Sequence, residues 1–238
     1  MRKKRFIYTL AAVLLMCSAA GVGAGCGKSS PALLDSFGTH LDTLMTSKDK
    51  LSKMDGAAAD LCVIENEDEF SENDIEAPAG ALFNITDQKT LYSKNANDER
   101  EIASITKIMT ALLAMKYADL SQEVTISYTP EGLESSAVLC GFEQGDKMML
   151  SSLLSAALIY SGNDAAIDIA IAVAGSQEAF VDMMNQESKE LMTSHTHFAN
   201  PTGLTQSKHY SSVYDVYLMF QECLKYPTFR DIIARGSF

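Results

Sequence analysis

A serine and a lysine three positions apart, Ser104 and Lys107, form the pattern in this sequence best suited to covalent catalysis. On a helix, residues i and i+3 lie on the same face, so the hydroxyl and the amine would be neighbours. A serine becomes a strong nucleophile when a base removes its proton, and a lysine can be that base when burial lowers its pKa. In the first turn of a helix, such a serine also lies beside free backbone N–H groups that can bind an oxyanion.

The spacing alone is not specific, because the same pattern recurs from Ser47 to Lys50. The two copies differ in their surroundings. Ser47 lies in a polar segment, whereas Ser104 opens a long apolar stretch in which a lysine side chain would be buried. We therefore assign the candidate nucleophile to Ser104 and the candidate general base to Lys107.

A second polar cluster, Ser161-Gly162-Asn163, separates two apolar stretches. Buried polar groups need hydrogen-bond partners, and Lys107 together with a substrate would supply them. A simple turn between two helices, capped by Asn163 or Asp164, would explain the same residues. Serine–lysine acyl enzymes carry S-x-x-K, then S-x-N, then K-T-G, and the first two motifs occur here in that order. We therefore place Ser161 and Asn163 in the site, as catalytic and substrate-binding residues.

The elements that would position these residues are mostly helical. Apolar residues at three- and four-residue spacing predict helices over 102–118, 148–160, 164–174, 177–192 and 212–224, with a short one starting near Pro227. Two apolar runs, 81–85 and 90–93, flank a polar turn and predict a β-hairpin, and 124–126 is a short strand candidate. Asn200-Pro201-Thr202-Gly203 has the chemistry of a turn. The predicted fold class is α+β.

The N-terminus has the layout of a secretory signal: basic residues, an apolar run that ends at Met16, and small residues up to Gly25. We assign residues 1–26 to a signal peptide of the lipoprotein type, with Cys26 as the lipidation candidate. Gly23 departs from that pattern, which usually has an aliphatic residue there. Cleavage without lipid attachment, or an uncut membrane anchor, are the alternatives. Each of these interpretations predicts export from the cytoplasm.

After the signal, residues 27–76 read as a tether and an acidic loop, and residues 77–238 read as the domain. Apolar side chains at helical spacing predict a helix over 33–45 within the tether. The acidic loop, residues 65–76, carries seven carboxylates and is typical of a solvated segment.

Composition excludes several classes of function. The 238 residues are 47% hydrophobic and 21% charged, which is typical of a globular protein. With 19 basic and 31 acidic residues the net charge is −12, which argues against nucleic-acid binding. Cys62, Cys140 and Cys223 are too few and too widely spaced for a disulfide framework, and neither they nor the histidines have the spacing of metal ligands. We expect buried or unpaired thiols and no metal or other cofactor.

Longer strings around these motifs resemble the serine-type D-Ala-D-Ala carboxypeptidases, the low-molecular-mass penicillin-binding proteins. The strings are Ala103–Thr110, Ser161–Ala166, Phe180–Asn185, Phe198–Leu204 and His209–Ser212. The resemblance implies a penicillin-binding or β-lactamase-like fold, in which a helical cluster packs around a central antiparallel sheet.

The resemblance also implies an activity, namely removal of the terminal D-alanine from peptidoglycan stem peptides through an acyl-enzyme that β-lactams would block. Ser104 would attack the carbonyl between the two D-alanines and Lys107 would take its proton. Ser161 would help to pass that proton to the leaving amine, and Asn163 would complete the hydrogen-bond network. Such an enzyme would act at the outer face of the cytoplasmic membrane, or in the periplasm or extracellular space.

Two features depart from the family pattern. Ile102 stands where the family commonly has proline, and no Lys-Thr-Gly or Lys-Ser-Gly occurs in the 238 residues. In the family that third motif lies on an edge strand of the sheet, where it supplies a cation for the substrate carboxylate and an oxyanion N–H. We therefore expect residues 77–238 to be an incomplete D,D-peptidase domain that lacks the C-terminal strands.

Two other functions fit parts of the sequence. The missing third motif would suit an inactive remnant that binds cell-wall fragments without turning them over. A β-lactamase is disfavoured, because class A enzymes have aspartate where Gly162 stands, and no E-x-x-L-N pattern follows it.

Overall fold

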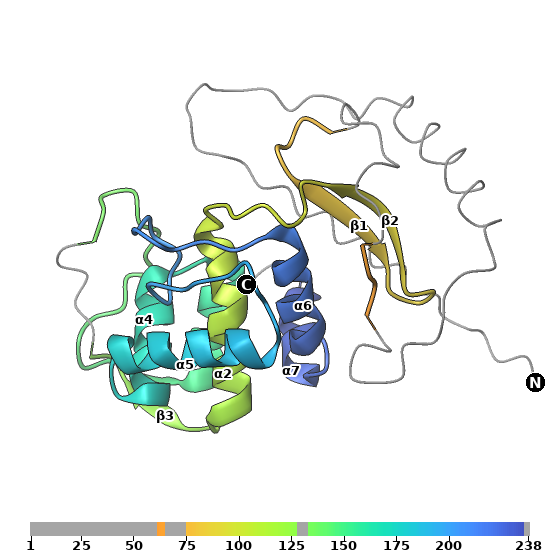
Figure 1. The fold of residues 1–238 in the computed structure, drawn as a ribbon. Helices are drawn as coiled ribbons and strands as arrows, with labels where there is room; N and C mark the ends of the chain where they lie inside the picture. Colours follow the sequence, from red (N-terminus) through yellow and green to blue (C-terminus); the bar gives the residue numbers. More distant parts are fainter. Residues whose placement is uncertain (1–60, 65–74, 128–132, 236–238) are drawn as a thin grey trace, which may run out of the picture. The chain divides into compact units, whose positions relative to one another are not determined.

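The computed structural model describes residues 61–64, 75–127 and 133–235, and the chain divides into two compact units between Ala96 and Asn97 (Figure 1). The predicted signal peptide with Cys26, the tether helix and most of the acidic loop lie outside the described residues. No helix in the described part of the chain is long and apolar enough to cross a membrane.

The first unit contains the predicted hairpin, in which β1 (Gly80–Asn84) pairs antiparallel with β2 (Lys89–Lys94). Asn84 stabilises the connecting turn, because its Oδ1 accepts hydrogen bonds from the backbone N–H groups of Thr86 and Asp87, both at 3.1 Å. The hairpin prediction is confirmed.

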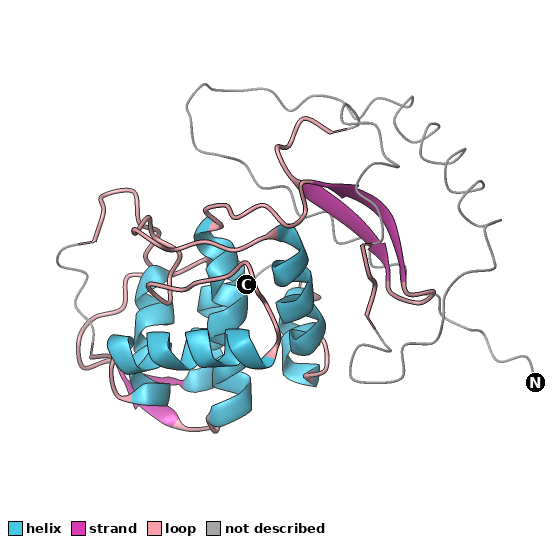
Figure 2. Ribbon diagram, in the orientation of Figure 1, coloured by secondary structure: helices cyan, strands magenta, loops and turns pink. Residues whose placement is uncertain are grey.

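The strands form two separate two-stranded sheets and not the single central sheet that the resemblance implied (Figure 2). The second sheet pairs β3 (Glu123–Thr125) with β4 (Lys147–Met149). Within the described residues, each strand is paired inside its own sheet, and only the isolated parallel bridge between Val63 and Lys89 adds to the hairpin. The α+β class is therefore confirmed, while the central sheet is absent from the part described.

The second unit is built around α2 (Lys107–Tyr117), which contacts α4 (Asn163–Ala174), α5 (Gln177–Glu190) and α6 (Val213–Cys223) (Figure 1). Apolar side chains lie on most sides of α2, so it can be packed against several neighbours at once. The other helical segments are η1 (Ala103–Thr106), α3 (Leu150–Ser155), η2 (Ala156–Tyr160) and α7 (Pro227–Ile233). Because α2 starts at Lys107, the core of this unit fixes the place of the candidate base.

The prediction of one helix over 148–160 was wrong in two respects: where the helix begins, and which kind of helix its last turn forms. Residues 147–149 are extended and pair with β3, so the α-helix begins at Leu150. Its last five residues form the π-helical turn η2, in which the chain winds more widely before Ser161. The other predicted helices match the observed ones to within a few residues at their ends.

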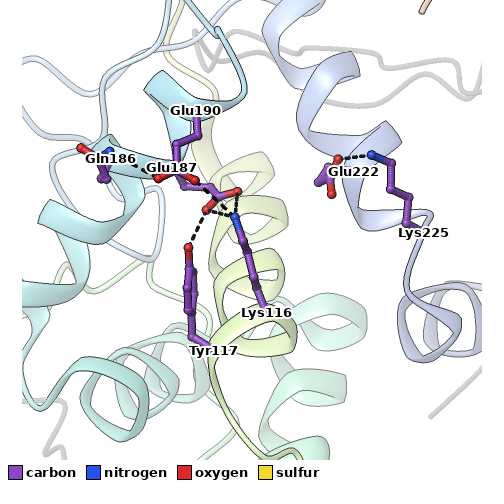
Figure 3. Close-up of polar contacts among 7 residues, drawn as sticks. All are labelled: Lys116, Tyr117, Gln186, Glu187, Glu190, Glu222 and Lys225. Atoms are coloured by element: carbon purple, nitrogen blue, oxygen red, sulfur yellow. Dashed lines mark hydrogen bonds and ion pairs between the residues drawn. The ribbon is translucent and has the colours of Figure 1, made fainter. Parts of the chain in front are cut away.

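An ion pair between an exposed lysine and a buried glutamate ties the C-terminal end of α2 to α5 (Figure 3). Lys116 Nζ donates to the two carboxylate oxygens of Glu187 at 2.9 and 2.8 Å, and Tyr117 Oη donates to the same carboxylate at 3.2 Å. The Glu187 side chain is 2% exposed and that of Lys116 is 32% exposed. The hydrogen bond to Glu187 raises the pKa of Lys116 above its usual value. Lys116 therefore stays charged, and the pair joins two helices that are distant in sequence.

We expect Glu187→Ala to lower the free energy of unfolding by about 1–3 kcal/mol, because it removes the acceptor of Tyr117 and leaves Lys116 with the longer contact to Glu190, at 3.4 Å. The lysine is part-exposed, so water limits the loss. Glu222→Ala is the matched control, since its partner Lys225 is 68% exposed, and it should cost under about 1 kcal/mol. Urea unfolding of both variants measures the two losses of unfolding free energy. Equal losses would show that the Lys116–Glu187 pair stabilises the protein no more than the exposed Glu222–Lys225 pair does.

Candidate active site

The segment that carries the candidate nucleophile begins with an unusual backbone conformation. Ala103 has φ of +46°, a region that residues with a side chain seldom occupy. The chain then forms the 3₁₀ turn η1 and continues as α2 from Lys107. Ser104 therefore lies in the first turn, where the sequence predicted it, and is exposed, while the side chain of Lys107 is buried.

Four oxygen atoms surround the amine of Lys107, and they come from three parts of the chain. Nζ lies 2.9 Å from Asn163 Oδ1 and 2.8 Å from the backbone carbonyl oxygen of Thr202. It lies 3.2 Å from Ser104 Oγ and 3.4 Å from Ser161 Oγ. The structure thus brings all four predicted site residues together around one amine.

The two closer oxygens decide how this amine can be used. Asn163 Oδ1 and the Thr202 carbonyl oxygen can only accept, so the amine must donate a hydrogen to each. A neutral amine then has one tetrahedral position left, and that position holds its lone pair. Only the hydroxyls of Ser104 and Ser161 remain to occupy it, and either can donate to it. The geometry therefore suits removal of a proton from Ser104.

The charge state of Lys107 fits the same use. Burial lowers its pKa from 10.5 to about 8, and Cys140 and the carboxylate of Asp164 oppose this change in part. Among the described residues no carboxylate is hydrogen-bonded to the amine, so none of them fixes the ammonium form as firmly as an ion pair would. A substantial fraction of Lys107 is neutral near pH 8 and able to accept a proton.

The loop with Ser161 is shaped by the end of η2. Ser161 adopts the left-handed conformation, with φ of +64° and ψ of +28°, and its backbone N–H donates to the carbonyl of Ala156. Gly162 follows, and a Cβ there would lie 2.3 Å from Cys140 Sγ, so any larger residue would require the Cys140 side chain to move. Gly162 is also the N-cap residue of α4 and has no side chain to cap it. In the alternative reading, Asn163 or Asp164 would be the cap; neither stands at that position, although Asp164 Oδ1 accepts from the first-turn N–H of Ala165 at 2.9 Å.

The amide of Asn163 is oriented from both sides. Its Oδ1 accepts from Lys107, and its Nδ2 donates to the carbonyl oxygen of Val138 at 3.1 Å. The backbone N–H of Asn163 donates to the same carbonyl at 2.9 Å. The opposite rotamer would turn an NH₂ group toward the amine, so the Val138 carbonyl selects the one that accepts from Lys107.

The segment from Asn200 to Gly203 was predicted only as a turn, yet it supplies part of the site. Asn200 Oδ1 accepts from the backbone N–H groups of Thr202 and Gly203 at 3.1 and 2.7 Å, which holds the turn closed. The Thr202 carbonyl then accepts from Lys107, and the Pro201 carbonyl accepts from Thr110 at 2.7 Å. Main-chain acceptors leave no signature in side-chain types, which is why sequence reasoning missed Thr202.

Gly203 makes the closest approach in the site. Its φ is +87°, and a Cβ at this position would lie 1.8 Å from the carbonyl oxygen of Ala103 and 2.9 Å from Thr106 Oγ1. The turn thus lies directly against the backbone that precedes Ser104. Two strained residues, Ala103 and Ser161, and one obligatory glycine are placed within the same small region.

His209 is a second residue that the sequence did not assign to the site. Its Nδ1 accepts from the backbone N–H of Ala199 at 3.0 Å, so Nε2 carries the hydrogen and donates to Thr106 Oγ1 at 2.7 Å. Burial, helped by the nearby His197, lowers the pKa of His209 to about 4. His209 is therefore a neutral link between η1 and the 199–203 segment. In the described residues, no group of three or more His, Cys, Asp or Glu could hold a metal ion.

Comparison with known proteins gives a consistent result. The sequence profile of a family described as D-alanyl-D-alanine carboxypeptidase matches residues 66–234. D-alanyl-D-alanine carboxypeptidase DacF of Bacillus subtilis is 41% identical over 156 residues, and DacA of Escherichia coli is 32% identical over 160 residues. Each match covers 63% of this chain and 40% of the relative, so the chain spans about two fifths of the length of these curated relatives.

The fold of a solved relative agrees with the sequence match. The crystal structure of penicillin binding protein 6B from Escherichia coli is similar, with a TM-score of 0.60 and 26% identity. The similarity covers 63% of this chain and 51% of that protein.

We expect Gly203→Ala to destabilise the protein by about 3 kcal/mol or more, because the new Cβ would overlap the Ala103 carbonyl group as well as straining the backbone. Gly175→Ala is the matched control. Gly175 has φ of +83° but open space around it, so it should cost only the conformational strain, about 1 kcal/mol. Urea unfolding of the two variants separates the steric overlap from the backbone strain. Similar losses of unfolding free energy in both would show that the turn does not press on Ala103.

Proposed function

We propose that this chain, which belongs to the D-alanyl-D-alanine carboxypeptidase family, is part of a serine D,D-carboxypeptidase that removes the terminal D-alanine from peptidoglycan stem peptides. One observation carries the proposal. The buried amine of Lys107 is held by two pure acceptors, which leaves its lone pair to the hydroxyls of Ser104 and Ser161. An exposed serine beside a buried neutral amine suits attack on a peptide carbonyl.

We propose the following reaction for these residues. Ser104 Oγ attacks the carbonyl carbon between the two D-alanines while Lys107 takes its proton. We propose that the backbone N–H of Ser104, in the first turn of η1, stabilises the oxyanion. As the C–N bond breaks, the proton passes from Lys107 by way of Ser161 to the leaving amine, and D-alanine departs. Water then hydrolyses the ester on Ser104 and restores its hydroxyl.

The partners follow from the same chemistry. β-Lactams present a reactive carbonyl like that of the scissile peptide, so they would acylate Ser104 and remain attached. The substrate lies in the cell wall, and the proposed signal peptide of residues 1–26 would export the protein to it. We further propose that Cys26, if lipidated, anchors the protein to the outer face of the membrane.

The family also uses a third motif, Lys-Thr-Gly, for the substrate carboxylate and for a second oxyanion N–H. The 238 residues contain no such string, and we propose that the working enzyme takes these groups from sequence that follows Phe238. The coding DNA beyond the Phe238 codon decides this. An open frame leading to the motif supports the carboxypeptidase, whereas a stop codon would favour the inactive wall-binding remnant.

We expect Ser104→Ala to reduce labelling of the full-length protein by a fluorescent penicillin at least about 1,000-fold, because Ser104 carries the exposed hydroxyl beside the Lys107 base, whereas the Ser161 hydroxyl is less exposed and lies 3.4 Å from the amine. Ser47→Ala, which removes the other S-x-x-K serine, is the matched control and should label like the parent. Gel fluorescence measures both. Labelling that survives in Ser104→Ala would remove Ser104 from its role, and rapid release of hydrolysed penicillin by the parent would favour a β-lactamase.

We expect the rate of acylation to rise with pH, with a midpoint near pH 8, because Lys107 accepts the proton only when it is neutral and its pKa is about 8. Below the midpoint the neutral fraction falls tenfold for each pH unit, so the rate at pH 6 should be about one hundredth of the plateau. Stopped-flow acylation between pH 6 and 9.5 measures the profile. A rate independent of pH over this range would exclude Lys107 as the base.

A further inference from the structure

We propose that Asp164 is a positioning residue of this site, which clamps the segment 138–141 against the second motif and so orients Asn163 toward Lys107. The proposal rests on the function proposed above. Asp164 follows the S-x-N motif and touches neither the nucleophile nor the amine through a hydrogen bond, so no motif assigns it a role.

The carboxylate of Asp164 is buried, with 4% of the residue exposed, and it binds backbone rather than a cation. Its Oδ1 accepts from the N–H groups of Cys140 and Ala165 at 3.0 and 2.9 Å, and its Oδ2 accepts from the N–H of Gly141 at 3.0 Å. Three charge-assisted hydrogen bonds to backbone are a strong restraint on a segment that has no helix or strand of its own. Asp164 therefore fixes where residues 138–141 lie.

The position of that segment matters because of Val138. Its carbonyl oxygen accepts both from the side-chain Nδ2 and from the backbone N–H of Asn163. If the segment moves away, the Asn163 amide loses the contact that selects its rotamer and can present NH₂ to Lys107. The amine would then lose one of the two acceptors that hold its hydrogens, and its lone pair would no longer be directed at the serine hydroxyls.

Substitution by asparagine tests the clamp with little change of volume. Asparagine has one acceptor oxygen where aspartate has two, so an NH₂ group would face the N–H of either Cys140 or Gly141. Two donors facing one another in a buried site repel, and the 138–141 segment would shift outward. The effect should reach the site through position and not through loss of a reacting group.

The substitution also removes a negative charge near Lys107. The titratable groups that act on the charge of Lys107, from the elements packed around it, are the thiol of Cys140 and the carboxylate of Asp164. Both raise its pKa, against the larger effect of burial. Without the charge of Asp164, the pKa of Lys107 should fall further, and the pH midpoint of acylation should move below that of the parent. A purely structural defect would lower the rate and leave that midpoint in place.

The experiment compares Asp164→Asn with Asp168→Asn in the full-length protein. Asp168 lies one turn further along α4, is 1% exposed, and its Oδ1 accepts from the backbone N–H and the hydroxyl of Ser127 at 2.9 and 3.1 Å. It is thus a matched buried carboxylate that also clamps a loop, but one without an effect on Lys107. We expect Asp164→Asn to slow acylation by fluorescent penicillin about 10- to 100-fold and to lower its pH midpoint. Asp168→Asn should retain the parental midpoint and a rate within a few-fold of the parent.

A second readout does not need activity. Burial, together with the neighbouring charge and hydrogen bond of Asp164, raises the pKa of Cys140 to about 12, so its thiol reacts slowly in the parent. Asp164→Asn removes that charge and frees the segment, so alkylation of Cys140 by iodoacetamide should quicken at least about tenfold, as mapped by peptide mass spectrometry. Asp168→Asn should leave it unchanged.

The two readouts separate the two proposals. If the parent is not acylated by penicillin, the proposed function fails, and faster alkylation of Cys140 in Asp164→Asn alone still supports the clamp. If the parent is acylated, but Asp164→Asn acylates at the parental rate and midpoint, the positioning role is wrong. Unchanged alkylation of Cys140 in folded Asp164→Asn would also overturn it.

Discussion

The burial of one amine, that of Lys107, is the constraint on which the rest of the site depends. A lysine amine removed from water must either pair with a carboxylate or lose its charge. Here it is surrounded by neutral oxygens from segments that lie far apart in the chain, at Asn163, Thr202 and the two serines. Each segment must reach the amine with an oxygen, and their backbone conformations follow from that requirement.

The conformations needed are not relaxed ones. Ala103 and Ser161 both have positive φ, and each such residue costs on the order of 1–3 kcal/mol. Gly203 lies so close to the Ala103 carbonyl that only glycine fits. The helical unit offsets this cost, because α2 is buried over most of its length and its far end is joined to Glu187. The packing of the helices thus stabilises the protein enough to keep Ala103 and Ser161 in strained backbone conformations near the nucleophile.

Much of this arrangement can be predicted from the sequence, and the limits have physical causes. Helical periodicity located α2, and the apolar context distinguished Ser104 from the copy at Ser47, because buried helices and buried bases both need apolar neighbours. The carbonyl of Thr202 could not be found this way, since every residue has a carbonyl. The three-residue strand β4 was read as helix, because a run so short has no period to measure. His209 was set aside because the histidines lack the spacing of metal ligands, and its neutral role depends on burial that only the fold reveals.

The order of Asn163 and Asp164 shows how the site keeps a buried lysine basic without ionising it permanently. A carboxylate at position 163 would face Nζ at hydrogen-bond distance, and such an ion pair would raise the pKa of Lys107 well above neutrality. The amide found there accepts the same hydrogen bond without a charge. The carboxylate one position later binds three backbone N–H groups instead, so its charge reaches Lys107 only as a weaker, more distant effect. Exchanging these two side chains would preserve the composition of the loop and lose the base.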